Sequence, residues 1–286
     1  KVRLIHQKTT LTTDSLNYDR KRNIAYYFSG GMIEDSLNTL TSHWGQYTPD
    51  NHQAIFRSDV KLINPKFILT ADTLGYNTES YQSDLVGPTT ILYEEETTIL
   101  STNGWYNTKS ELSMLLDRSQ VIHVDGMTLT GDTIYYDKAQ GYGKCIGNIE
   151  SVDSTHSMTL YGHKAEMWES NNRAYVTDSA MLLDWSDSTT YTYMHADSLW
   201  TEEIPYQIYT LAERDSILID SILRAQQPDT IWSDTTYQQL RAYRNVRIYR
   251  SDLQAVCDSA RYHGRDSIIT LFGMPICWNE ENQISA

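Results

Sequence analysis

The chain has 286 residues and a net charge of −14, with 21 Tyr, 4 Phe and 6 Pro. This acidic balance argues against a nucleic-acid partner, because phosphate binding needs clustered Lys and Arg, and the longest basic run is Arg20-Lys21-Arg22. No apolar run approaches the ~18 residues of a membrane-spanning helix. Abundant Tyr and scarce Pro favour strands.

The cysteines Cys145, Cys257 and Cys277 have no metal-ligand spacing. A Cys257–Cys277 disulfide stays open, although an odd count of cysteines favours free thiols buried in strands. The sequence thus offers no metal site, no cofactor motif and no cluster of catalytic groups.

A short motif recurs along the chain, and its clearest copies are residues 11–19, 69–77 and 129–137. Its central Asp, or a His or Asn in the same place, stands at Asp14, His43, Asp72, Asn103, Asp132, His163, Asp197 and Asp258. The steps are 29 to 34 residues, apart from a final step of 61 that spans two periods. This regularity predicts an all-β array of strand–turn–strand repeats of ~30 residues.

The motif contains a change of parity. Leu69 and Leu74 are five residues apart, and so are Leu129 and Ile134, so a flat strand would put the two members of each pair on opposite faces. A bulge or sharp bend near the central Asp puts both on one face. We therefore expect each strand to bend near this residue, around an elongated apolar interior, with Leu129 and Ile134 both inside across a kink near Asp132. The Asp would form local hydrogen bonds at the bend.

The pattern fails between residues 201 and 240. Apolar residues at 211, 218, 222 and 225, followed by Pro228, predict an amphipathic helix over 211–227 that packs on the sheet, and residues 228–236 read as a loop. Three parts follow: repeats over 1–200, a helical and loop insertion over 201–240, and resumed repeats over 241–286. The next central Asp would fall at 287, so the last part looks truncated.

The array resembles the OstA-like family of lipopolysaccharide-transport proteins, which includes LptA and the amino-terminal domain of LptD. The resemblance rests on the recurring Leu-x-Ala-Asp-x-Leu-x-Tyr strand, and the acidic, Tyr-rich strands are similar to members from Bacteroidetes. It implies an elongated, taco-like β-jellyroll, open along one seam, that holds the acyl chains of lipid A. It further implies a non-enzymatic periplasmic component, free or associated with the outer membrane, whose leader peptide has been removed. Its partners would be lipopolysaccharide and other transport proteins or itself, joined end to end through edge strands.

The candidate lipid-binding residues are the apolar members of the strands. They are Leu16, Leu40, Leu62, Leu69, Leu74, Leu100, Leu129, Ile134, Leu160, Met181, Leu183 and Leu199. The simpler interpretation is that they pack only against each other, since apolar strand faces mostly make core.

Two other functions stay open. One is a structural or adhesive cell-envelope β-solenoid with a packed core and no lipid ligand. The other is a carbohydrate-active β-helix with paired carboxylates. The acidic residues recur once per repeat, and the run Glu94-Glu95-Glu96 has no partner base nearby, so the enzyme hypothesis is the weakest.

Overall fold

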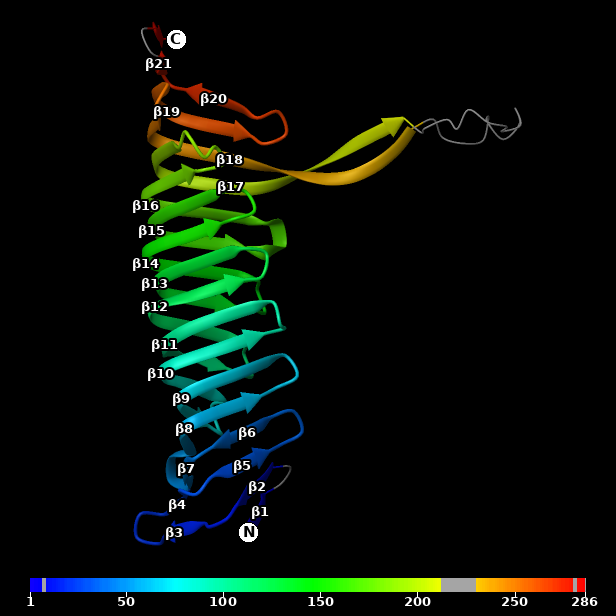
Figure 1. The fold of residues 1–286 in the computed structure, drawn as a ribbon, viewed down its shortest axis with the longest axis vertical. Coiled ribbons are helices and arrows are strands. Elements are labelled where there is room, and N and C mark those ends of the chain that lie inside the picture. Colours follow the sequence, from blue (N-terminus) through cyan, green and yellow to red (C-terminus); the bar gives the residue numbers. More distant parts are fainter. Residues whose placement is uncertain (7–8, 212–229, 280–281, 286) are drawn as a thin grey trace, which may run out of the picture.

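The computed structural model describes residues 1–6, 9–211, 230–279 and 282–285. The described chain is an elongated stack of antiparallel strands, with the N-terminus at one end and the C-terminus at the other (Figure 1). Two short 3-10 turns, Pro49–Asn51 and Glu169–Asn171, interrupt it. No helix in the described part is long and apolar enough to cross a membrane. The predicted all-β, bent-sheet architecture is confirmed.

The strands are short at the two ends and long between them. The short strands at the amino-terminal end are β1 (Val2–His6), β2 (Thr9–Thr13), β3 (Asn17–Asp19), β4 (Ile24–Tyr27), β5 (Gly31–Glu34), β6 (Thr39–Ser42) and β7 (Trp44–Thr48). The long strands are β8 (Gln53–Ile63), β9 (Phe67–Asn77), β10 (Gln82–Tyr93), β11 (Thr97–Asn107), β12 (Leu112–His123), β13 (Met127–Asp137), β14 (Tyr142–Asp153), β15 (Met158–Trp168), β16 (Arg173–Asp184), β17 (Thr192–Leu211), β18 (Thr230–Arg250) and β19 (Leu253–His263). The last strands are β20 (Ile268–Phe272), β21 (Ile276–Asn279) and β22 (Asn282–Ser285).

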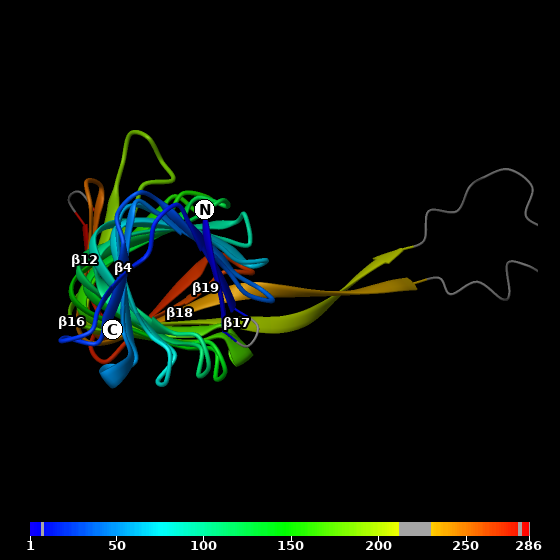
Figure 2. The same cartoon turned by 90° about the horizontal axis from the view of Figure 1, so that it is seen from below.

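Each long strand spans two arms of one folded sheet. In β8, residues 61–63 lie beside β6, whereas residues 53–57 lie beside β7. We call the part that continues β1, β2, β5 and β6 the first arm, and the part that continues β3, β4 and β7 the second arm. Seen along the long axis, the sheet curves around this axis (Figure 2).

The bend between the arms is built differently on alternate strands. On β12 the buried residues Leu115 and Ser119 are four apart, and Asp117 and Arg118 between them have positive φ angles of 56° and 57°. On β13 the buried residues Gly131 and Ile134 are three apart. The ladder register shifts at this point on each side of β13, which is the signature of a bulge. The expected parity change therefore occurs on β13, whereas the four-residue step on β12 keeps Leu115 and Ser119 on one face without a change of parity.

Polar side chains at the bend bond to each other between neighbouring strands, whereas the expected bonds were local in the sequence. Asn148 Nδ2 donates to Asp132 Oδ2 at 2.7 Å, and Asn245 Nδ2 donates to Asp197 Oδ1 at 3.1 Å. These bonds hold residues such as Asn148, whose φ of 44° is otherwise unfavourable for a side chain with a Cβ. Leu129 and Ile134 lie in the same apolar cluster, so the predicted kink near Asp132 is confirmed.

One repeat is shifted by a residue from its expected register. On β11 the buried residues are Ser101 and Gly104, where β9 has Ala71 and Leu74. The structural equivalent of the central Asp in this repeat is therefore Thr102, and the expected equivalence of Asn103 is wrong.

The predicted loop over 228–236 is wrong for residues 230–236, which lie in β18. The pairing of β17 with β18 runs without a gap from Ser198 opposite Tyr243 to Leu211 opposite Thr230. The neighbouring strands pair over a shorter length: the pairing of β16 with β17 ends at Glu202 of β17, and the pairing of β19 with β18 ends at Gln239 of β18. The outer parts of β17 and β18 therefore form a two-stranded arm that projects from the stack (Figures 1 and 2). Cross-strand pairing overrides the polar composition that favoured a loop.

The predicted helix over 211–227 lies, except for Leu211, outside the described residues. The three-part division of the chain stays a prediction. The three cysteines are free, so Cys257 and Cys277 form no disulfide.

Close packing at the bend makes a test of the fold possible. A Cβ on Gly131 would overlap Sγ of Cys145, whereas a Cβ on Gly75 would meet only Cβ of Asp84 at 3.3 Å. We expect Gly131→Ala to lower the free energy of unfolding by about 1–3 kcal/mol, because the packed bend cannot expand. Urea denaturation measures the loss. Gly75→Ala should stay within about 0.5 kcal/mol of the parent protein, and Gly131→Ala should cost less in a Cys145→Ala background. Equal losses for both glycines would contradict this packing.

Candidate functional site in the apolar interior

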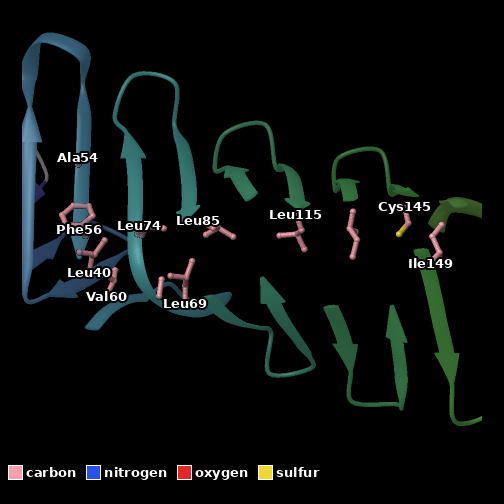
Figure 3. Packing of buried hydrophobic residues seen from close by; sticks show 12 residues of the cluster. Leu40, Ala54, Phe56, Val60, Leu69, Leu74, Leu85, Leu115, Cys145 and Ile149 are labelled. Carbon is pink, nitrogen blue, oxygen red and sulfur yellow. The ribbon is translucent and has the colours of Figure 1, made fainter. Parts of the chain in front are cut away.

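The interior consists of apolar side chains on the inner faces of both arms. They form two clusters, one from Leu40 to Ile149 and one from Val176 to Ala260. Ala165 packs against both, so the apolar interior runs on between the clusters. Figure 3 shows members of the first cluster in a row along the long axis, between two rows of hairpin turns.

One row of directly opposed residues follows the bend on the side of the second arm. We call it the bend row: Tyr27, Gly45, Phe56, Leu74, Leu85, Gly104, Leu115, Ile134, Cys145, Ala165, Val176, Leu199, Ala242, Ala260 and Leu271. Most of these side chains are buried, Leu74 and Leu199 to 1% exposure. The bend row is therefore packed core.

The bend row is filled by larger side chains toward the amino-terminal end. Tyr27 is 2% exposed, packs between Gly31 and Gly45, and shares a 2.6 Å hydrogen bond with Oγ of Ser42. At the other end the corresponding position on β18 is Ala242. Burial also raises the pKa of the Tyr27 hydroxyl.

A second row lies on the inner face of the first arm and crosses every strand there from β1 to β22. We call it the track row: Leu4, Leu11, Ile33, Leu40, Leu62, Leu69, Ile91, Ile99, Val121, Leu129, Ser151, Leu160, Leu182, Met194, Ile248, Ala255, Cys277 and Ile284. Ser151 is its one hydroxyl-bearing member. Many members are only half-buried, and the end members Leu4 and Ile284 are 45% and 69% exposed. Part of the apolar surface of the track row therefore stays accessible in the folded protein.

A third row faces the track row from the second arm. We call it the tyrosine row: Tyr47, Ala54, Tyr76, Ser83, Tyr106, Ser113, Tyr136 and Gly143. Each Tyr alternates with a small residue, which leaves space for the ring beside it. This alternation accounts for four of the 21 tyrosines in the sequence.

Side chains of the two arms meet across the seam in the amino-terminal half. The ring of Phe67, on the first arm, meets Tyr106, on the second arm, edge to face at 6.5 Å between centroids. Lys66 Nζ lies 3.9 Å from Glu111 Oε1, and Lys138 donates a hydrogen bond to the Tyr93 hydroxyl. These are side-chain contacts, and no backbone ladder in the described ranges joins the tips of the arms.

Most of the candidate lipid-binding residues lie in the interior. Leu40, Leu62, Leu69, Leu74, Leu129 and Ile134 belong to the first cluster, and Leu160 and Leu199 to the second. Leu16 is half-buried outside both clusters.

Three candidates do not face the interior. Leu100 is 39% exposed on the outer face, because the one-residue shift of its repeat puts Ile99 inside. Met181 and Leu183 lie on the face of β16 opposite to Leu182, which packs into the second cluster. Sequence reasoning missed Ile99 and Leu182, which lie two residues from the buried bend residues Ser101 and Ala180 and share their face.

No group of three or more His, Cys, Asp or Glu side chains in the described ranges is arranged to hold a metal ion.

Comparison with known protein families gives a match at the amino-terminal end of the chain. The family model described as OstA-like protein matches residues 1–72, so the predicted resemblance to this family is confirmed, with the direct match covering the first quarter of the chain. The Bacteroidetes origin stays a prediction. No curated protein matches the chain.

Among solved structures, the chain is similar to LptH of Pseudomonas aeruginosa, described as the LptA-homologous periplasmic component of the lipopolysaccharide transport device. The identity is 18%, and the match covers 51% of this chain and 94% of LptH with a TM-score of 0.34. This likeness is too distant to carry an argument about function.

The tyrosine row predicts a fall in stability at high pH. Burial raises the pKa of Tyr76, Tyr106 and Tyr136, and the hydrogen bond from Tyr136 to Glu169 Oε1, 2.7 Å long, raises the pKa of Tyr136 further. The folded state thus holds these protons more tightly than the unfolded chain. The resulting stability is complete below the ordinary tyrosine pKa of about 10 and is lost as the pH rises through the folded-state values.

Urea denaturation at about pH 8 and about pH 11 measures this loss, and absorbance titration follows the tyrosines themselves. Tyr136→Phe should reduce the pH dependence. A free energy of unfolding that rises over this interval would contradict the expected sign.

Proposed function

We propose that this chain is a periplasmic component of lipopolysaccharide transport, which shields the acyl chains of lipid A along the track row. The observation that carries the proposal is the track row itself, a line of residues that crosses every first-arm strand from Leu4 to Ile284 and is apolar except at Ser151. The OstA-like match over residues 1–72 supports the same class of function. The role requires no catalytic group, cofactor or nucleic acid.

The energetics favour such a row. An acyl chain in water costs about 0.8 kcal/mol for each CH₂, or about 10 kcal/mol for a chain of ~12 methylenes. Neighbouring members of the track row are one strand apart, about 4.8 Å. An acyl chain that lies over several strands exchanges only part of its contacts when it advances by one strand. Movement along the track row can therefore be nearly isoenergetic.

The alternative of a packed solenoid with no lipid ligand fits the bend row better than the track row. In such a solenoid, side chains from both arms would pack together and bury the inner apolar residues completely. Ile91, Ile99 and Val121 are half-buried, and side-chain contacts rather than a backbone ladder join the arms at the seam. A seam of this kind can separate without breaking the sheet.

Neighbouring residues on β11 give a matched test. Ile99 packs toward the interior, and Leu100 is exposed on the outer face. With a photo-crosslinking amino acid at either position, we expect lipopolysaccharide to be captured at residue 99 at least about tenfold more efficiently than at residue 100, because contact with an acyl chain requires the inner face. Immunoblotting of the crosslinked protein for lipopolysaccharide measures the capture. Equal capture at both positions, or none at residue 99, would exclude lipid carriage inside the sheet.

We propose further that the chain joins copies of itself or other transport proteins through its edge strands. An unpaired edge can accept an additional strand by backbone hydrogen bonding. On β1, Ile5 is 63% exposed. A strand added to β1 would extend the track row, since Leu4 stands at its end.

A charge on β1 should oppose this association. We expect Ile5→Lys to weaken self-association of the 286-residue chain by about tenfold, because a charge on an edge strand disfavours pairing with another edge. Sedimentation velocity over a range of concentrations measures it. Val124→Lys, at a turn residue that is 72% exposed, is the control and should leave association unchanged. A parent protein that stays monomeric at all concentrations would refute self-assembly.

A further inference from the structure

The outer face of the second arm carries a line of aromatic rings. Tyr135, Tyr142, Trp168, Tyr175 and Trp200 come from the five consecutive strands β13 to β17. Their centroids are separated by 6.4, 5.7, 6.0 and 4.7 Å in that order. We call this line the aromatic ladder. Interior rings of the ladder have a neighbour on each side, as Trp168 has Tyr142 at an interplanar angle of 47° and Tyr175 at 21°.

The ladder ends at Trp200. One face of its indole stacks on Tyr175 at an interplanar angle of 19°. The residue opposite Trp200 on β18 is Arg241, whose guanidinium binds Glu202 at 2.6 Å and Gln239 at 2.6 and 2.8 Å. The guanidinium of Arg173 lies over the indole of Trp200, 5.9 Å from the ring centroid.

A cavity lies beside this end of the ladder. It has a volume of about 260 Å³ and is lined by Arg173, Trp200, Thr201, Glu202, Arg241 and Tyr243. A second cavity of about 430 Å³ shares Trp200 and Tyr243 with it and adds Thr177, Asp197, Ser198, Arg244 and Asp258. The two cavities form one open groove around the end of the ladder, which we call the Trp200 groove.

The charges of the Trp200 groove balance. Arg173, Arg241 and Arg244 face Asp197, Glu202 and Asp258, so the groove has no net preference for an anion or a cation. It offers both donors and acceptors, together with the hydroxyls of Thr177, Ser198 and Tyr243. A ligand that suits such a groove is neutral, has hydroxyls that both donate and accept, and has one apolar face for the indole.

A pyranose ring has these properties, because its axial C–H groups form an apolar face and its hydroxyls point outward from the ring. We propose that the Trp200 groove binds a pyranose unit of a saccharide, with its C–H face stacked on Trp200. Tyr175 holds the indole from behind, so little conformational entropy is lost on binding. Arg173 and Arg241 are 43% and 39% exposed and keep N–H groups free to donate to sugar hydroxyls.

The inference does not rest on lipid carriage, because the Trp200 groove lies on the outer face. Two envelope sources could supply the pyranose: the saccharide of lipopolysaccharide or the glycan strand of peptidoglycan. The probes are therefore the lipid-free saccharide released from lipopolysaccharide by mild acid and peptide-free glycan fragments of peptidoglycan. Saturation-transfer NMR with the 286-residue chain reports direct contact, and the quenching of Trp fluorescence gives the affinity.

We expect saturable binding of at least one probe, and the probe that binds identifies the source. Trp200→Ala should weaken binding by at least about tenfold through loss of the stacking surface. Trp168→Ala removes an equally large ladder ring that lines neither cavity of the Trp200 groove, and should leave binding unchanged. Tyr243→Ala, at a residue that is 40% exposed, provides a second variant with little effect on folding and should also weaken binding.

Circular dichroism checks that each variant is folded. Failure of both probes to bind the parent protein, or equal binding by the Trp200 and Trp168 variants, would overturn the proposal. Neither result bears on the photo-crosslinking test of the interior.

Discussion

The structure depends on one geometric constraint: side chains along a strand alternate between two faces. A sheet that folds over on itself needs its apolar residues on the inner face before and after the bend. Regular alternation would provide this, but at a bulge one strand of a pair has an extra residue, so the two strands cross the bend in steps of different length and the odd step reverses the parity. The chain meets the constraint with two matched devices, a three-residue step on β13 and a four-residue step on β12 and β14. The backbone ladders resume in register on both sides.

The bend divides the interior into the bend row and the track row, which have different roles. The bend row stabilises the fold, because residues such as Leu74 and Leu199 are almost completely removed from water. The track row contributes less to stability, since many of its members stay half-buried. A lipid carrier needs this separation. If one set of side chains both formed the core and bound the ligand, loss of the ligand would expose the core of the empty protein.

Much of this arrangement could be predicted from the sequence. The period is visible in the spacing of the motif copies, and the parity change is visible within one copy, such as residues 129–137. The errors have a physical cause. At Leu100 the motif has two polar residues, Thr102 and Asn103, that can each take the place of the central Asp, and a slip of one residue reverses the face of every side chain. The four-residue steps are harder to foresee. Pairs such as Asp117-Arg118 adopt positive φ angles without glycine, so composition does not mark them. The projecting arm of β17 and β18 was missed because polar alternation suits a loop as well as a two-stranded ribbon.

Alternation also separates the two surfaces of the sheet. Leu199 and Trp200 are neighbours on β17, yet Leu199 is 1% exposed inside the second cluster and Trp200 stacks on the outer face. Packing in the bend row restricts the residue type at position 199, whereas it places no such restriction on position 200. A sheet one layer thick can therefore hold two independent kinds of site back to back, one apolar and one rich in hydroxyl and charged groups. An amphiphilic ligand has the same two kinds of surface, so a protein that handles such ligands gains from a wall whose faces can be adapted separately.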